Sequence, residues 1–339
     1  MSKNVIFSGV QPSGDLHIGN YIGTIKQWVE LQESLNGTRP RTELIFCIVD
    51  LHAITVPQNP AVLREKIREL AALYIAVGID PEKSHLFVQS ENLDHAVLAW
   101  IFDCITPMGW MARMTQYKDK NEKQQASGTV GLFNYPALMA ADILLYDTTH
   151  VPVGEDQIQH VELARDIAKK FNNAYRKLFA IPKPMIDKQA ARIMSLSNPK
   201  AKMSKSDVDP NGTINLLDNA DDIKKKITRA VTDSGDEISY NPSDKPAISN
   251  LMTIYSRLSG QSVEDIEKKY AGKGYADFKT DLAEVVITAL KPIQDRYTKL
   301  RREEVYLNKI LDDGITFAHR KSSKKLSDVK QAIGLGRKI

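Results

Sequence analysis

Short apolar segments alternate with amphipathic helical segments in the first half of this 339-residue chain. Residues 4–8 (NVIFS), 44–49 (LIFCIV) and 85–89 (HLFVQ) have the length and character of buried strands. Between the last two, Asn59 and Pro60 provide a helix cap and a first-turn proline, and apolar residues follow at helical spacing. Because parallel strands need helical crossovers, this alternation predicts an α/β fold with a doubly wound parallel sheet.

The second half of the chain lacks strong strand patterns and is predicted to be helical, at 246–260, 262–271 and 275–310. We therefore expect three parts: a Rossmann-like α/β domain at 1–206, a smaller α-helical domain at 207–295, and a basic helical segment at 296–339 that packs back on the first domain. The linkers between the two halves are expected at 181–184 (IPKP) and 197–212.

The cysteine count and the hydropathy favour the cytoplasm. Cys47 and Cys104 are the only cysteines, so we expect neither a disulfide framework nor a Cys-based zinc site. No stretch approaches the roughly 18 apolar residues of a membrane-spanning helix. Residues 1–9 are expected to form a first strand and not a signal peptide.

Positive charge is concentrated near the end of the sequence. The whole chain has a net charge of +4, whereas residues 291–339 hold 13 basic and 6 acidic residues, a net charge of +7. Such a region forms either a solvated helix face or a surface that contacts phosphates. If it binds a nucleic acid, Arg301, Arg302, Lys324 and Lys325 are the candidate contacts.

The first segment that suggests chemistry is 9–20 (GVQPSGDLHIGN), between the first strand and a helix. Loop amides and a helix N-terminus favour phosphate binding. Gly14 and Gly19 allow a nucleotide to approach the backbone, and His17 and Asn20 offer hydrogen-bond donors. The same residues would also serve as an ordinary turn and helix cap.

The second such segment is 202–206 (KMSKS). Its two lysines and two serines suit a leaving pyrophosphate, although a solvated linker has the same composition. Together, the two segments resemble the signatures of class I aminoacyl-tRNA synthetases. The first is similar to His-Ile-Gly-His but ends in Asn20, and the second matches the other signature letter for letter.

The resemblance implies ATP as a substrate, Mg²⁺ bound through the ATP phosphates, and no metal ligands from the protein. It implies catalytic roles for His17, Lys202 and Lys205. The ATP-binding residues that it implies are Gln11, Pro12, Ser13, Gly19, Asn20, Lys120, Gly154, Glu155, Asp156, Ile193, Lys202, Met203, Ser204, Lys205 and Ser206.

A third segment, 135–146 (YPALMAADILLY), points to the amino acid. We expect a helix with Pro136 near its start and with Tyr135, Met139 and Asp142 on one face. A carboxylate among apolar neighbours suits an indole N–H, which is a donor only. A buried aspartate paired with another protein group is the alternative. The segment resembles the specificity helix of tryptophanyl-tRNA synthetases.

The fourth segment, 150–157 (HVPVGEDQ), is expected at a strand end, where ligands bind in doubly wound sheets. Asp156 is a candidate for ribose hydroxyls and Gln157 for the polar end of the amino acid, although acids there also offset a helix dipole. We assign no role to His85, His95, His160 or His319. The tryptophan-binding residues that the resemblance implies are Phe7, His52, Tyr135, Met139, Asp142, Val151, Val153 and Gln157. A cap or another structural role is the alternative for His52.

The resemblance implies ATP-dependent activation of L-tryptophan to tryptophanyl-adenylate and transfer to the 3′ end of tRNA(Trp), by a homodimer in the cytoplasm. It also implies that 207–295 binds the tRNA anticodon. A tyrosyl-tRNA synthetase is the nearest alternative. The others are a nucleotidyltransferase of the same fold that makes a small adenylate, and a non-catalytic RNA-binding protein.

Overall fold

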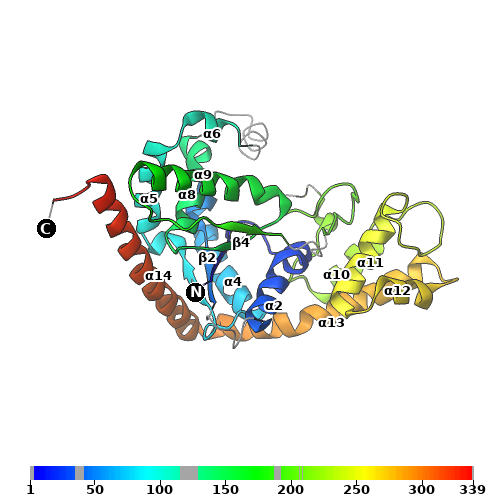
Figure 1. Cartoon of the computed structure of the whole chain (residues 1–339). Coiled ribbons are helices and arrows are strands. Elements are labelled where there is room, and N and C mark those ends of the chain that lie inside the picture. Colours follow the sequence, from blue (N-terminus) through cyan, green and yellow to red (C-terminus); the bar gives the residue numbers. More distant parts are fainter. Residues whose placement is uncertain are drawn as a thin grey trace.

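Five parallel strands form the central sheet of the structure, a computed structural model that describes residues 4–34, 42–114, 129–186, 192–205, 207 and 209–337 (Figure 1). The strands lie in the order β3-β2-β1-β4-β5, and β1 pairs with β2 on one side and β4 on the other. Their bounds are β1 Val5–Val10, β2 Glu43–Ile48, β3 His85–Val88, β4 His150–Pro152 and β5 Lys183–Met185. The chain thus reverses its direction of winding at β1, and the predicted α/β class is confirmed.

The fifth strand was not predicted. The segment 181–184 was expected to be a linker, but Lys183–Met185 pairs with β4, with Lys183 opposite His150. Two prolines and a lysine conceal this strand in the sequence. Proline is tolerated here because β5 lies at the edge of the sheet, where one side of the strand needs no ladder hydrogen bonds.

Helices cover both faces of the sheet. Successive side chains of a strand point to opposite faces, so each strand contributes to two cores. Ile6 faces a core that includes α2 (Lys26–Ser34) and α4 (Pro60–Ala76). Phe7 faces the other core, with α5 (Asp94–Ile105), α8 (Val130–Leu144) and α9 (Ile158–Ala174). The expected cap of α4 is present, since the side chain of Asn59 accepts hydrogen bonds from the backbone of the first turn.

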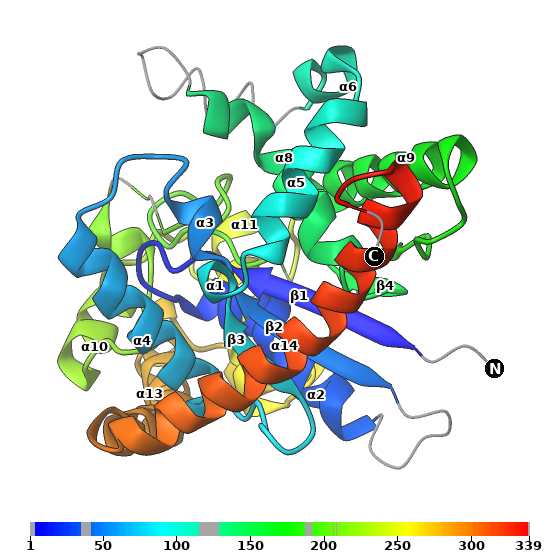
Figure 2. The ribbon, with the colours of Figure 1, turned by 90° about the vertical axis from the view of Figure 1, so that its left-hand side faces the viewer.

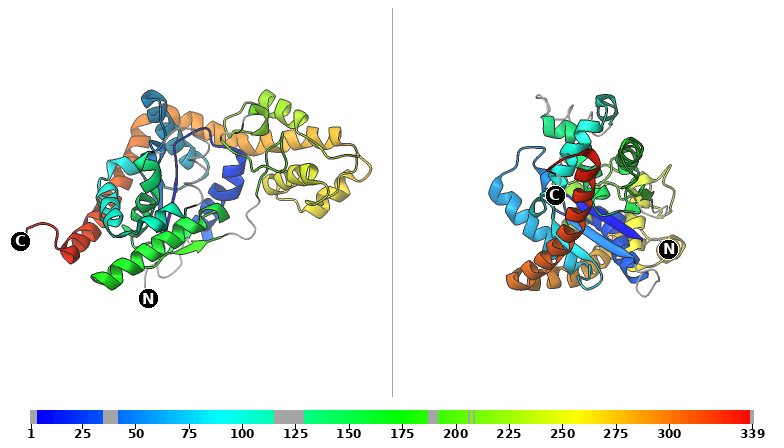
Figure 3. Two further views of the ribbon diagram at one scale, coloured as in Figure 1. Left: turned by 90° about the horizontal axis from the view of Figure 1, so that it is seen from above. Right: turned by 60° about the vertical axis from the view of Figure 1, so that its left-hand side comes forward.

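The helical half extends to one side of the sheet (Figure 3). It contains α10 (Ala220–Arg229), α11 (Pro246–Ser259), α12 (Val263–Tyr270) and α13 (Tyr275–Arg302). The segment 275–310 is helical as expected, but it belongs to two helices, because α13 ends at Arg302 and α14 (Glu304–Ile333) follows. The predicted domain boundary at 295/296 falls inside α13, which also packs against α4.

Helix α14 packs along the edge of the sheet at β3 (Figure 2). Its first turns contribute Leu307 to one core, and its later turns contribute Phe317 to the other. Between them, Gly314 lies so close to the main-chain oxygen of Leu86 that a Cβ atom would sit 1.8 Å from it. Glycine is therefore required where this helix crosses the edge strand.

Seven short elements complete the described structure: α1 (Ile18–Asn20), the π-helical turn η1 (Tyr21–Ile25), α3 (Asp50–Ala53), η2 (Gln89–Glu91), α6 (Met108–Ala112), η3 (Glu155–Gln157) and η4 (Pro210–Gly212). Among the described residues, none of the helices carries an apolar stretch long enough to cross a bilayer. The isolated bridge between His17 and Asn215 ties the loop after β1 to the start of the helical half.

Candidate active site

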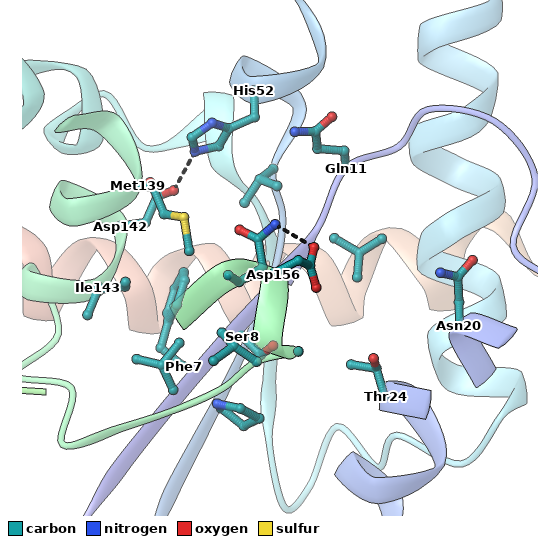
Figure 4. A pocket seen from close by; sticks show the side chains of 18 of the residues that line it. Phe7, Ser8, Gln11, Asn20, Thr24, His52, Met139, Asp142, Ile143 and Asp156 are labelled. Carbon is teal, nitrogen blue, oxygen red and sulfur yellow. Dashed lines mark hydrogen bonds and ion pairs between the residues drawn. The ribbon is translucent and has the colours of Figure 1, made fainter. Parts of the chain in front are cut away.

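A pocket of about 340 Å³ lies at the carboxyl ends of β1 and β4. This is the point where the sheet changes its direction of winding, and ligands bind there in doubly wound folds. Figure 4 shows Phe7, Met139 and Asp142 at one end, Asn20 and Thr24 at the other, and Asp156 between them. The lining residues are Phe7, Ser8, Gly9, Val10, Gln11, Asn20, Thr24, Trp28, Val49, His52, Tyr135, Met139, Asp142, Ile143, Val151, Pro152, Val153, Gly154, Asp156, Gln157 and Lys202.

Helix α8 provides one wall of the pocket. The helix begins at Val130, where the side chain of Thr129 accepts a hydrogen bond from the N–H of Leu132. Pro136 therefore lies inside the helix, and the prediction that it marks the helix start was wrong. The expected face is present, since Tyr135, Met139 and Asp142 all line the pocket.

Asp142 is buried at the apolar end of the pocket and is surrounded by donors. Its Oδ1 atom lies 2.6 Å from Nε2 of Gln89 and 2.6 Å from Nδ1 of His95. Its Oδ2 atom lies 2.9 Å from Nε2 of His52. Burial alone would raise the pKa of this carboxyl, but hydrogen bonds from His52 and His95 outweigh burial and hold the pKa well below its usual value. The group is therefore a carboxylate at neutral pH.

Gln89 and His95 were not among the site residues predicted from the sequence. Gln89 follows β3 directly, and a polar residue at the carboxyl end of a parallel strand is a recognisable signal. His95 gives no such signal, because it is a single histidine near the start of the mostly apolar helix α5. Only the packing of α5 against α8 brings it to Asp142.

The other walls around Asp142 are apolar or aromatic. Phe7 comes from β1, and Val151 and Val153 come from β4 and the residues after it. The hydroxyl of Tyr135 lies 2.8 Å from Nε2 of His160, which is buried behind the pocket wall. The structure thus brings all eight predicted tryptophan-binding residues to one pocket.

His17 caps the helix that begins at the other end of the pocket. Its Nδ1 atom accepts a hydrogen bond from the N–H of Asn20 at 3.2 Å, and the Asn20 side chain accepts one from the N–H of His17 at 3.3 Å. Burial, together with the charges of Lys205 and Lys202, lowers the pKa of His17 to about 4. The ring is therefore neutral near pH 7, and its proton is on Nε2. Gly19 is needed there, because a Cβ atom would lie 2.9 Å from the His17 ring.

The two signature lysines have different environments. Lys202 is half exposed, lines the pocket and lies 3.7 Å from a carboxylate oxygen of Asp156. Lys205 is half-buried, and its ammonium donates to the main-chain oxygens of Gln11 (3.4 Å) and Ser13 (2.8 Å). Burial lowers the pKa of Lys205 to about 8.

A short hairpin holds the second signature in place. Met194 forms an antiparallel bridge with Lys202, and the N–H of Met203 donates to the oxygen of Ile193. Asn250 of α11 binds this hairpin from the helical half. Its side chain accepts from the N–H of Met194 (2.8 Å) and donates to the oxygen of Met194 (3.0 Å).

The predicted ATP-binding residues divide into three groups. Five line the pocket: Gln11, Asn20, Gly154, Asp156 and Lys202. Seven others lie in the same segments of the sequence as these lining residues: Pro12, Ser13 and Gly19 in the first-signature loop, and Ile193, Met203, Ser204 and Lys205 in the 193–205 segment. Glu155 opens η3. Lys120 and Ser206 lie outside the described residues.

Part of the basic tail is occupied by contacts within the chain. Arg301 pairs with Glu65 of α4 at 2.5 Å. Lys325 pairs with Asp147 at 2.6 Å and donates to the main-chain oxygen of Leu178. Arg302 and Lys324 are exposed. The four candidate phosphate contacts are therefore not equivalent. In the described part of the chain, no group of three His, Cys, Asp or Glu side chains is placed to hold a metal ion.

Known proteins resemble the chain over almost its whole length. A family model for class I tRNA synthetases (W and Y) matches residues 1–291. The tryptophan–tRNA ligase of Wolinella succinogenes is 52% identical over 335 residues, which cover 99% of this chain and 100% of that protein. The tryptophanyl-tRNA synthetase structure from Mycoplasma pneumoniae has a TM-score of 0.88 and 35% identity, and covers 99% of both chains. The Campylobacter jejuni tryptophanyl-tRNA synthetase complexed with ADP and tryptophan has a TM-score of 0.83 and 38% identity, and covers 98% of this chain and 100% of that one.

Proposed function

The chain belongs to the class I tRNA synthetases of the tryptophan and tyrosine branch, and we propose a role for its residues in each step of the reaction. Its function is ATP-dependent activation of L-tryptophan to tryptophanyl-adenylate and transfer to the 3′ end of tRNA(Trp). The tryptophanyl relatives favour tryptophan over the tyrosine alternative. The pocket itself is the observation that supports the residue assignment most. It has the buried carboxylate of Asp142 at its apolar end, and Lys202 lines it together with Gln11 of the 9–20 loop.

We propose that Asp142 accepts a hydrogen bond from the indole N–H. Its Oδ1 atom already accepts two hydrogen bonds, and its Oδ2 atom accepts one from His52. A carboxylate has about four lone-pair positions, so one position on Oδ2 is left for a ligand donor. The apolar surfaces of Phe7 and Val151 suit the rest of the indole ring.

In the activation step, an oxygen of the tryptophan carboxylate attacks the α-phosphorus of ATP. The bond between this phosphorus and the oxygen leading to the β-phosphate breaks, and pyrophosphate leaves. The substrate provides the nucleophile, so the protein contributes positioning and charge stabilisation. We assign the stabilisation of the pyrophosphate to Lys202, Lys205 and the Nε2–H of His17, with Mg²⁺ arriving on the ATP phosphates.

The middle of the pocket is assigned to the groups that the reaction joins. Asp156 lies between the two ends and near Lys202, which suits a contact to the ribose hydroxyls of ATP. Gln157 lies beside Asp156, with its amide 3.1 Å from that carboxylate, and is our candidate for the polar end of tryptophan. Gly154 has no side chain where the nucleotide would pass.

We also propose a homodimer that works in the cytoplasm. Leu93 and Trp100 are 74% and 67% exposed, and with Val97 they form an apolar stripe at helical spacing along the start of α5. Met108 and Val130, on neighbouring elements, are exposed as well. Such a surface suits a second copy of the chain. The test is the mass of the protein in solution. If Trp100→Asp halves this mass and Val305→Asp, at another exposed position, leaves it unchanged, the result supports this interface.

The proposed function is tested by ATP–pyrophosphate exchange with each of the twenty amino acids. Exchange that depends on tryptophan alone is the expected result. Exchange with tyrosine in preference to tryptophan would indicate the tyrosyl enzyme. Tryptophan-dependent exchange without charging of tRNA(Trp) would indicate a nucleotidyltransferase, and no exchange at all would indicate a binding protein.

A further inference from the structure

A chain of buried hydrogen bonds connects Asp142 to the interior of the protein. Oδ1 of Asp142 lies 2.6 Å from Nδ1 of His95, and Nε2 of the same histidine lies 2.7 Å from the hydroxyl of Tyr146. That hydroxyl lies 3.1 Å from Nδ2 of Asn92. All four side chains are buried, so the hydrogen bonds are shielded from solvent.

The chain continues from Asn92 into α14. Nδ2 of Asn92 also lies 2.9 Å from Oγ of Ser322, and this hydroxyl donates to Oδ2 of Asp94 at 2.6 Å. The orientation of the Asn92 amide is set locally, because its Oδ1 atom accepts from the N–H of Asp94 at 3.3 Å. Its two amide protons therefore point to Tyr146 and Ser322.

The directions of the hydrogen bonds follow from the Asn92 amide at one end of the chain and the Asp142 carboxylate at the other. Since Asn92 donates to the Tyr146 oxygen, the Tyr146 proton is available for Nε2 of His95. The carboxylate of Asp142 can only accept, so Nδ1 of His95 donates to it, and Nε2 of a ring with a single proton accepts the Tyr146 proton. Asn92 and Tyr146 thus select one tautomer of His95.

This tautomer helps to fix the orientation of the Asp142 carboxylate in the pocket. His95 and Gln89 together occupy Oδ1, and His52 occupies one side of Oδ2. The carboxylate cannot rotate without losing these hydrogen bonds.

We propose that His95 is a specificity-determining positioning residue, which fixes Asp142 so that Oδ2 accepts the indole N–H of tryptophan. The inference rests on the proposed function, in which Asp142 recognises the indole nitrogen. It adds that the recognition depends on a residue outside the pocket lining and on the hydrogen bonds behind it. Loss of His95 should therefore reduce selectivity for an N–H donor, and not only binding in general.

The test is a discrimination ratio in pyrophosphate exchange: kcat/KM for tryptophan divided by kcat/KM for 3-benzothienylalanine, in which sulfur replaces the indole N–H. His95→Leu removes the donor to Asp142 and should lower this ratio about tenfold or more. His95→Asn can place an N–H near the position of Nδ1 and should restore most of the ratio. Tyr146→Phe removes the hydroxyl that contacts Nε2 of His95, so the tautomer of His95 is no longer selected although the histidine itself remains. This variant should lower the ratio by a smaller factor.

Equal losses for both substrates in His95→Leu, with an unchanged ratio, would show a purely structural role and overturn the proposal. If His95→Leu does not fold, an unchanged ratio in Tyr146→Phe overturns it in the same way. Asp142→Asn distinguishes the role of His95 from the proposed function. A ratio lost in Asp142→Asn but kept in the His95 and Tyr146 variants rejects the role of His95 alone, whereas a ratio kept in Asp142→Asn rejects the proposed recognition of the indole by Asp142.

Discussion

The ammonium of Lys205 donates a hydrogen bond to the main-chain oxygen of Ser13 at 2.8 Å, and this contact joins the two signature segments across 192 residues. The side chain of Lys205 also packs over Gly14, where a Cβ atom would lie 3.0 Å from the Cβ of the lysine. Gly14 has a φ of +62°, which favours glycine. A phosphate group bound beside this contact would compete with the main-chain oxygen of Ser13 for the ammonium of Lys205.

Replacing Lys202 or Lys205 with alanine should slow adenylate formation. These charges are expected to act on the developing pyrophosphate, so kcat and kcat/KM should fall together, by about 10²-fold or more. The measurement is single-turnover formation of tryptophanyl-adenylate. Lys200→Ala, at an exposed lysine of the same segment, is the matched control. A variant that changes only the tryptophan KM would contradict the assignment.

The pH dependence of activation should depend on Lys205. Burial lowers the pKa of Lys205 to about 8, so the lysine is charged below this pH and loses its proton as the pH rises through it. We expect kcat/KM for ATP, which reports groups of the free enzyme, to decline above about pH 8. Lys205→Arg should remove this decline because arginine stays charged, whereas Lys202→Arg should keep it. The same decline in Lys205→Arg would exclude Lys205 as its source.

Asn250 should affect activation although it lies on α11, outside the pocket lining. Its amide holds Met194, and through it the hairpin that carries Lys202. Asn250→Ala should lower kcat for pyrophosphate exchange about tenfold and leave tryptophan binding nearly unchanged. Thr253→Ala is the control, because the Thr253 hydroxyl donates within its own helix, to the oxygen of Ser249. Equal behaviour of the two variants would show that the hairpin does not need this anchor.

The basic residues of the tail should fall into two classes. Replacing Arg301 and Lys325 with glutamine breaks contacts with Glu65 and Asp147, so it should cost about 1 kcal/mol of stability each and affect both reaction steps. Glutamine at exposed Arg302 and Lys324 should instead weaken tRNA charging more than pyrophosphate exchange, with a reduced salt dependence. Thermal unfolding and both assays check this division. Identical effects of the two pairs would contradict it.

The fold was largely predictable because the first three strands are continuous apolar runs and α4 has a cap and a clear period. The errors occurred where local sequence gives a misleading signal. Pro136 suggested a helix start but lies inside α8. The prolines around Lys183 concealed an edge strand, and the break at Glu303 between two long helices has no glycine or proline to mark it.

The lining of the pocket could be predicted, but the residues behind it could not. Tyr135, Met139 and Asp142 share a helix face, which sequence spacing reveals. The hydrogen bonds from Gln89 and His95 to Asp142 join three separate elements and depend on how α5 packs against α8. Tertiary packing of this kind leaves no local pattern in the sequence.

The recognition of tryptophan through Asp142 is the central claim. Asp142→Asn keeps the shape of the side chain, and its amide oxygen can still accept from Gln89 and His95. The other end becomes an NH₂ group, which cannot accept the indole proton.

The most direct measurement is calorimetric titration of L-tryptophan into the wild type and Asp142→Asn, after thermal unfolding has shown that the variant is folded. Loss of a hydrogen bond to a charged acceptor costs about 1.5–3 kcal/mol, so the variant should bind tryptophan about 10- to 150-fold more weakly, with an unchanged KM for ATP. Tryptophan affinity equal to that of the wild type would contradict the account.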